Sequence, residues 1–258
     1  MEPQQLLQIY LALWLAILGA ALGSFLCCAA DRGTLPTGRS RCDGCGHTLG
    51  ARDLIPIFSY IASRGRCRHC GGAIPTRCLT AEVVGAAGFA ALGLKFGPSP
   101  ELVMQLILAA LLLLLSLVDW TAYILPDKLL LAAAVNRLVF VLLLREPLEE
   151  ALPQMALGAF SVSLPLLLLS LVMDALLKKD TLGGGDIKLL FVLGLYLSWL
   201  EMLLLLALAC VLALLWAAGP GRRRAGGEIP LGPFLAAAWL AVTLFGAPLI
   251  QWYLSLLA

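Results

Sequence analysis

The sequence has few charged residues. Only 13% of its 258 residues are Asp, Glu, Lys or Arg, whereas 61% are hydrophobic, and the mean hydropathy is +0.94. Soluble globular domains carry roughly 25% charged residues, so the composition excludes that class and predicts an integral membrane protein. The formal net charge of +2 is too small to indicate a nucleic-acid partner.

Histidine is also scarce. The two histidines, His47 and His69, both lie in a polar stretch, and no long apolar run contains one. A Ser-His intramembrane protease needs a histidine within its membrane helices, and the zinc proteases of the HExxH type need two in that motif. Both classes are therefore excluded, and carboxylates are the side chains left for hydrolysis.

Long apolar runs are abundant. A bilayer-spanning helix takes roughly 20 residues, and seven runs reach or approach that length: about 6–26, 79–96, 102–118, 129–144, 157–177, 187–218 and 231–257. The sixth run is too long for one span and has a break near Ser198, Trp199 and Glu201, which predicts a hairpin of two helices. The last run is either one span or a re-entrant pair, because Gly246 and Pro248 interrupt it.

Basic residues give the topology, because short loops rich in Lys and Arg stay in the cytoplasm. Eight arginines lie between Arg32 and Arg77, Lys178 and Lys179 follow the fifth run, and three arginines follow the sixth at 222–224. This pattern predicts eight spans with the N-terminus outside and a cytoplasmic insert after the first. The first span has no charged segment before it, so we interpret it as a retained anchor.

The insert contains two Cys-x-x-Cys pairs separated by 21 residues: Cys42 with Cys45, and Cys67 with Cys70. Two such pairs can complete a tetrahedral zinc shell, and Gly46 and Gly71 allow the tight turns around a metal. Two disulfides or four free thiols are the alternatives, but a reducing cytoplasm disfavours disulfides and so small a domain needs a staple. Four cysteines fill the shell, so we expect His47 and His69 to face solvent.

Two acids lie at predicted membrane borders on the cytoplasmic side. Asp119 ends the third span, and Asp186 opens the sixth after the glycines of "GGGD". A carboxylate pair that shares one proton can activate water and protonate a carbonyl, as in aspartyl proteolysis. We expect Gly183 and Gly185 to adopt positive φ and to let an extended substrate approach. Capping of the next helix is the alternative role for Asp186, and the local sequence does not decide between the two.

Two further charged residues in or beside spans need a structural explanation. Arg137 lies within the fourth predicted span and must face an acid, for which Glu82 and Glu201 are both candidates. Asp127 follows Pro126 just before the same span, which favours a helix-capping role.

Together these motifs resemble the type IV leader peptidase family of bacterial prepilin peptidases, which are GxGD aspartyl proteases. The resemblance covers almost the whole chain: "GSFL" at 23–26, both cysteine pairs with "IPIFSYIASRGRCRHCG", "AE" at 81–82, Asp119 followed by "LPD", "GGGD" at 183–186, and "EIPLGPFLA" at 228–236. The order and spacing of the motifs are more specific than any one of them.

The resemblance implies a function. It implies that Asp119 and Asp186 are the catalytic pair, and that the substrate is a prepilin or a type II secretion pseudopilin, cleaved after the leader's glycine at the cytoplasmic face of the bacterial inner membrane. It also implies N-methylation of the new N-terminal residue, with S-adenosylmethionine as methyl donor, in members that keep the cysteine domain.

The sequence therefore predicts an all-α polytopic membrane protein of about eight transmembrane helices with a small zinc-ribbon-like cytoplasmic domain after helix 1. We divide it into a first transmembrane helix (1–30), a four-cysteine zinc-binding domain (31–78) and a transmembrane aspartyl peptidase core (79–258). Two other functions are considered. A presenilin-like GxGD protease does not account for the cysteine insert, and a proton- or metal-coupled transporter would place its acids near the bilayer midplane.

Overall fold

The structure is a computed structural model that describes every residue except 1–2, 34–38, 43, 179–182, 220–228 and 257–258. The described residues are mostly helical and contain no β-strand beyond two isolated bridges. They form two compact units, Met1–Leu117 and Val118–Ala258. The predicted division into three parts is a functional one and stays a prediction. Lys179 and the three arginines at 222–224 lie outside the described residues.

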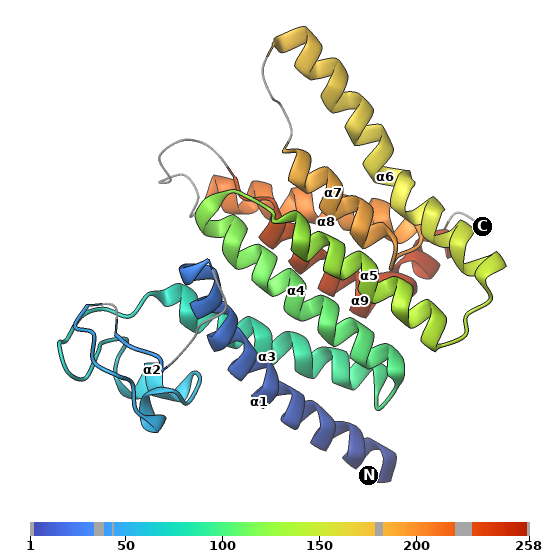
Figure 1. Cartoon of the computed structure of the whole chain (residues 1–258). Helices are drawn as coiled ribbons and strands as arrows, with labels where there is room; N and C mark the ends of the chain where they lie inside the picture. The colour runs from blue at the N-terminus through green and yellow to red at the C-terminus, as the bar shows by residue number, and fades with distance from the viewer. Residues whose placement is uncertain (1–2, 34–38, 43, 179–182, 220–228, 257–258) are drawn as a thin grey trace. The chain divides into compact units, whose positions relative to one another are not determined.

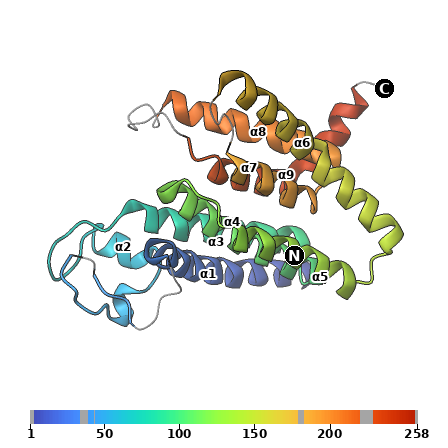
Figure 2. The ribbon, with the colours of Figure 1, turned by 45° about the horizontal axis from the view of Figure 1, so that its top comes forward.

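The first unit contains two long helices, the polar insert between them, and most of a third long helix. Its elements are α1 (Pro3–Arg32), the 3-10 helix η1 (Ala51–Asp53), α2 (Phe58–Ala62), α3 (Thr76–Phe96) and most of α4 (Pro100–Ala122). Helices α1 and α3 lie side by side, and the insert with α2 lies beyond one shared end of the two (Figures 1 and 2).

Glycine allows the close contact between α1 and α3. A Cβ atom at Gly19 of α1 would collide with the carbonyl oxygen of Gly85, and one at Gly23 would collide with that of Ala81. Helices in a membrane associate through packing of this kind, because small residues let the backbones approach. Gly23 belongs to the "GSFL" motif, so this contact gives that glycine a structural role.

The second unit is a helical bundle around a short central helix. It contains the end of α4, then α5 (Asp127–Leu143), α6 (Leu148–Leu177), α7 (Gly184–Gly194), α8 (Trp199–Ala218) and α9 (Gly232–Ser255). Helix α7 contacts each of the four helices that flank it, and most of its apolar side chains are buried. Gly158 of α6 and Gly194 of α7 leave room for each other's backbone.

The predicted spans are found in order as α1 and α3 to α9. Six of these helices are long and apolar enough to cross a membrane, whereas α5 has 17 residues and α7 only 11. Ser198 caps α8 and bonds to Glu201, which confirms the predicted break in the sixth run. Helix α9 is continuous through Gly246 and Pro248, so the re-entrant pair is wrong.

Large apolar side chains cover the outside of the helices. Trp14, Leu131, Leu168, Leu214 and Phe245 are each more than half exposed, as are many others. An apolar surface of this size is unfavourable in water, whereas the lipid tails of a bilayer accommodate it. The chain is therefore a multi-pass membrane protein.

Candidate active site and metal centre

Five helix termini meet at one end of the second unit, which we call the acid end: the last turns of α4 and α8 and the first turns of α5, α7 and α9. Trp120 of α4 packs edge-on against Trp216 of α8, with ring centroids 5.5 Å apart, and Trp216 lies 5.9 Å from Phe234 of α9. Asp127 of α5 pairs with Lys188 of α7 at 2.7 Å. These contacts bring the ends of α4, α5, α7, α8 and α9 to one place.

Asp119 lies in the last turn of α4 and is only 5% exposed. Its Oδ2 accepts a hydrogen bond of 2.9 Å from the backbone N–H of Gly232, the first residue of α9. A helix N-terminus carries partial positive charge and unpaired N–H groups, so this position stabilises a carboxylate. A Cβ atom at Gly232 would lie 2.8 Å from that oxygen, so only glycine permits the approach without a shift.

Asp186 lies in the first turn of α7, is half-buried, and interacts electrostatically with Asp119. Its N–H donates to the carbonyl oxygen of Gly183 at 3.0 Å. The helix is capped by Gly183 without a side-chain hydrogen bond, so the capping role for Asp186 finds no support. Two nearby carboxylates resist double ionisation and can hold one proton between them, which suits acid-base chemistry.

The expectation that Gly183 and Gly185 adopt positive φ is wrong. Gly183 has φ −62° and ψ 119°, and Gly185 is a helical residue without positive φ, because α7 already begins at Gly184. Both glycines instead leave room for a neighbouring side chain. A Cβ atom at Gly183 would lie 3.0 Å from Oδ2 of Asp186, and one at Gly185 would lie 3.1 Å from Cβ of Leu125. The "LPD" turn therefore packs directly on the "GGGD" motif.

Sequence reasoning missed the role of Gly232. The residue is part of the quoted motif "EIPLGPFLA", but nothing local shows that its N–H reaches a side chain 113 positions earlier. A glycine followed by a proline at the start of an apolar run is the available signal. It marks a helix N-terminus with an uncrowded first residue.

Arg137 pairs with neither Glu82 nor Glu201, so both expected partners are wrong. Its two terminal nitrogens each donate to a carboxylate oxygen of Glu146 at 2.9 Å, and Nε donates to the carbonyl oxygen of Leu195 at 3.2 Å. Glu201 instead caps α8. The guanidinium is thus neutralised at the opposite end of α5 from Asp127, away from the acid end. Asp127 is the first residue of α5. The N-cap of that helix is Pro126, and no side-chain hydrogen bond caps it, so the capping role expected for Asp127 is wrong.

The four cysteines of the insert come together in the first unit. Their sulfur atoms all lie within 4.8 Å of one another: Cys42, Cys45, Cys67 and Cys70. The Sγ atoms of Cys42 and Cys70 are 3.9 Å apart, against roughly 3.8 Å for two thiolates on one tetrahedral zinc with bonds near 2.3 Å. The donor set and its spacing fit zinc.

The two cysteine pairs form matching turns. In the first turn, the N–H of Cys42 donates to the carbonyl oxygen of His47, and the N–H of Gly46 donates to that of Cys42. In the second turn, the N–H of Cys67 donates to the carbonyl oxygen of Gly72, and the N–H of Gly71 donates to that of Cys67. All four bonds are 2.8 or 2.9 Å long. Gly46 and Gly71 have φ of 69° and 72°, which confirms the reason given for glycine at both positions.

The protonation of the cysteines is mutually dependent. Backbone N–H groups of Cys70 and His69 lower the pKa of Cys67 to about 6. The backbone N–H of His47 lowers the pKa of Cys45, but desolvation and the neighbouring Cys42 and Cys70 outweigh this effect and raise that pKa to about 11. Four thiolates this close need a cation to ionise together, which a bound metal ion provides.

Neither histidine belongs to the group of cysteine sulfurs. His47 and His69 are exposed, as expected, and their rings lie 3.5 Å apart between centroids. His47 lies two residues after Cys45, and His69 lies directly before Cys70. The contact between the rings therefore joins the two cysteine turns.

Comparison with known proteins places the sequence in a family. The bacterial peptidase A24 N-terminal domain matches residues 17–96, and the type IV leader peptidase family matches residues 106–218. A prepilin leader peptidase/N-methyltransferase of Burkholderia pseudomallei is 37% identical over 243 residues, which are 91% of this chain and 77% of that protein. The chain belongs to the type IV leader peptidase family.

Relatives of the same printed name occur in other bacteria. The Bacillus subtilis protein is 31% identical over 94% of this chain and 97% of its own length. The Aeromonas salmonicida protein is 32% identical over 87% of this chain and 77% of its own. No solved structure matches. Membership of the leader peptidase family confirms the resemblance and favours it over the presenilin-like protease and the transporter.

Proposed function

We propose that this chain is a bifunctional enzyme of the bacterial cytoplasmic membrane. It removes the leader from type IV prepilins or type II secretion pseudopilins, and it then methylates the new N-terminal amine. The observation that carries the peptidase activity is the acid end, where buried Asp119 is held by the Gly232 N–H within electrostatic reach of Asp186.

Asp119 and Asp186 have different surroundings, which supports different roles for them. Asp119 is buried against the N-terminus of α9, which stabilises its negative charge. We assign it as the carboxylate that takes a proton from the attacking water. Asp186 is more accessible and carries the shared proton, which it donates to the scissile carbonyl oxygen.

Proton balance then closes the reaction. Water forms the new C–O bond, the peptide C–N bond breaks, and the proton that Asp119 accepted passes to the leaving amine, which becomes the N-terminus of the pilin. As the tetrahedral intermediate collapses, the proton that Asp186 gave to the carbonyl oxygen returns to Asp186, and both acids regain their starting state. Gly183 and Gly184 are exposed next to Asp186, so an extended leader segment can lie against their backbone without meeting a side chain.

We place the acid end and the cysteine domain on the cytoplasmic side. The support comes from the eight arginines of the segment from Arg32 to Arg77, because basic short loops are retained in the cytoplasm. In the second unit the helix directions agree with one common face for the acids, since α4 ends and α5, α7 and α9 begin there.

The cysteine domain serves the second activity. We assign Cys42, Cys45, Cys67 and Cys70 as ligands of a structural zinc, because an insert this short needs a staple in addition to its own packing. S-adenosylmethionine supplies the methyl carbon when bound. The protein has to hold the donor beside the pilin amine and exclude water from both.

Replacement of the acids by amides tests the peptidase activity. We expect Asp119→Asn and Asp186→Asn each to reduce leader removal by at least about 10²-fold, because each amide keeps the shape of the acid and loses the proton transfer. Purified protein is incubated with a prepilin, and leader loss is followed by mass spectrometry. Glu101→Gln, at the exposed first turn of α4, is the matched control and should cleave normally. Full cleavage by either acid variant rejects the pair.

A further inference from the structure

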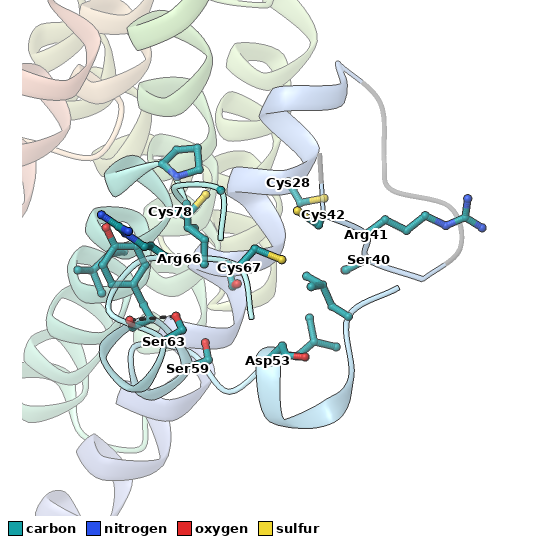
Figure 3. Close-up of a pocket in the computed structure, with 18 of the residues that line it drawn as sticks. Cys28, Ser40, Arg41, Cys42, Asp53, Ser59, Ser63, Arg66, Cys67 and Cys78 are labelled. Carbon is teal, nitrogen blue, oxygen red and sulfur yellow. Dashed lines mark hydrogen bonds between the residues drawn. The ribbon is translucent and has the colours of Figure 1, made fainter. Parts of the chain in front are cut away.

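A cavity of about 510 Å³ lies in the first unit between the insert and the adjoining ends of α1 and α3. Figure 3 shows Cys28 of α1 and Cys78 of α3 on one side of it, and Asp53 and Ser59 of the insert on the other. Its volume is within the range of about 300–1,000 Å³ found for small-molecule sites.

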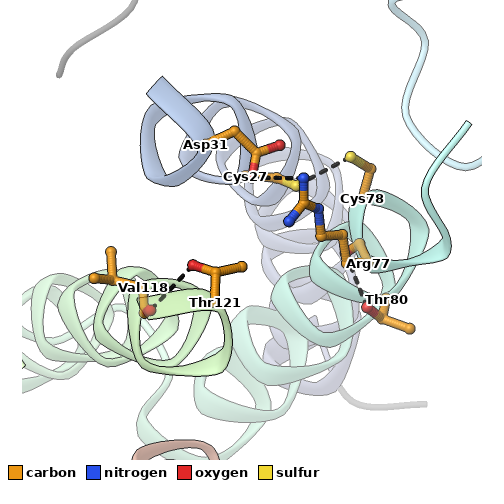
Figure 4. A network of polar contacts seen from close by, with 7 residues as sticks. All are labelled: Cys27, Asp31, Arg77, Cys78, Thr80, Val118 and Thr121. Carbon is orange, nitrogen blue, oxygen red and sulfur yellow. Dashed lines mark hydrogen bonds and ion pairs between the residues drawn. The ribbon is translucent and has the colours of Figure 1, made fainter. Parts of the chain in front are cut away.

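Two contacts fasten α1 to α3 beside this cavity. Arg77 pairs with Asp31 at 3.0 Å, and the sulfur atoms of Cys27 and Cys78 lie 3.0 Å apart (Figure 4). Because both helices are fixed at this end, the wall that they give to the cavity is preformed, which lowers the entropy cost of binding a ligand.

The acids that line the cavity differ in their partners. Asp31 is paired with Arg77, and Asp53 lies 3.6 Å from Arg68. Glu82 is the third acid of the lining. No Lys, Arg or His nitrogen of the described residues lies within ion-pair distance of its carboxylate, so Glu82 has no direct ion-pair partner among them.

Glu82 is also deeply placed, with only 7% of its surface exposed. Its Oε2 accepts a hydrogen bond of 2.6 Å from the backbone N–H of Ile57. Ile57 has φ 65° and ψ −54°, a strained backbone for a β-branched residue and one that tends to occur at functional sites. A neutral N–H donor does not balance a buried carboxylate, so the site is suited to a cation.

We propose that this cavity binds the methyl donor and that Glu82 faces one of the donor's two cationic groups. The inference rests on the proposed methyl transfer. S-adenosylmethionine carries a sulfonium, an ammonium and a carboxylate. Glu82, which has no ion-pair partner among the described residues, can face either the sulfonium or the ammonium. The five arginines of the lining outnumber its three acids, which suits the carboxylate of the ligand. The ring of Tyr60, also in the lining, offers an aromatic face for the adenine or the sulfonium.

The variant Glu82→Gln tests this assignment. The amide oxygen can still accept the Ile57 N–H, so the loop is held while the charge is lost. We expect the affinity for S-adenosylmethionine, measured by calorimetry on the full-length protein without any pilin, to fall by roughly 10- to 100-fold. Glu101→Gln removes an exposed charge from the same unit and should bind normally. Wild-type affinity in Glu82→Gln overturns the proposal.

S-adenosylhomocysteine, which lacks the sulfonium charge, shows which group Glu82 faces. A loss confined to S-adenosylmethionine assigns Glu82 to the sulfur, and an equal loss for both ligands assigns it to the ammonium; either result supports the cavity. Zinc content and prepilin cleavage report whether Glu82→Gln folds.

A second measurement uses the wild-type protein and does not depend on that variant. Cys28 lines the cavity, whereas Cys210 is exposed on α8. We expect S-adenosylmethionine to slow maleimide labelling of Cys28 several-fold and to leave Cys210 unchanged. Equal labelling of Cys28 with and without a saturating donor overturns the site.

The result separates this inference from the proposed function. Donor binding and Cys28 protection without a methyl group on the cleaved pilin would uphold the cavity and reject the methyl transfer. Methylated product from a protein in which Cys28 is not protected would uphold the function and reject the cavity.

Discussion

The variant Gly232→Ala gives a sensitive test of the acid end. The new Cβ atom would lie 2.8 Å from Oδ2 and 3.3 Å from Cβ and Cγ of Asp119, whereas carbon contacts are comfortable at about 3.5–4.0 Å. The carboxylate must therefore move by a few tenths of an ångström or more. The hydrogen bond from the Gly232 N–H, now 2.9 Å, is lengthened by the same movement.

The expected cost can be estimated from these two effects. Misplacement of a catalytic group by about 1 Å can cost about 10²-fold in rate, and a hydrogen bond to a charged group contributes about 1.5–3 kcal/mol. We expect kcat for leader removal to fall by about 10- to 100-fold, which corresponds to about 1.4–2.8 kcal/mol on the barrier. The close contact and the weakened hydrogen bond also lower stability, and the better helix propensity of alanine, about 1 kcal/mol, offsets this loss only in part.

The assay compares kcat for a prepilin peptide with the thermal unfolding midpoint of the same preparation. Gly50→Ala is the control, because the backbone there has φ −83°, a Cβ atom would meet only Oδ2 of Asp53 within 4 Å at an ordinary 3.6 Å, and the position also precedes a helix. We expect that control to cleave at the wild-type rate. Gly232→Ala at the wild-type rate would show that the position of Asp119 does not depend on this glycine, and would refute the reasoning.

Two further predictions concern the other clusters. Cys45→Ser should lose the zinc that the wild-type protein carries, as measured by metal analysis, whereas Cys210→Ser on the exposed side of α8 should keep it; unchanged zinc in Cys45→Ser would reject the four-cysteine site. Glu146→Gln should lower the free energy of unfolding by about 1–3 kcal/mol, because it leaves the charge of Arg137 without its bidentate partner. Glu149→Gln, in the exposed first turn of α6, should change it by less than about 0.5 kcal/mol in the same denaturation assay.

Much of the architecture could be predicted from the sequence. The apolar runs define the helices because a bilayer requires every backbone N–H to bond within its own segment, and the helices duly follow the runs, including the break before Trp199. The cysteine turns were also predictable, because the chemistry of each Cys-x-x-Cys pair is local and Gly46 and Gly71 adopt the required φ.

The contacts between helices were decided only by the tertiary structure. Arg137 bonds to Glu146 rather than to an acid in another span, because the guanidinium reaches the loop at the end of its own helix. The N–H of Gly232 reaches Asp119 because α9 begins where α4 ends, and that of Ile57 reaches Glu82 because the insert folds back onto α3. Local sequence determines which residues are helical and which can ionise or bind metal. The rotation and approach of each helix depend on packing at small residues far apart in the chain, and these decide which groups meet.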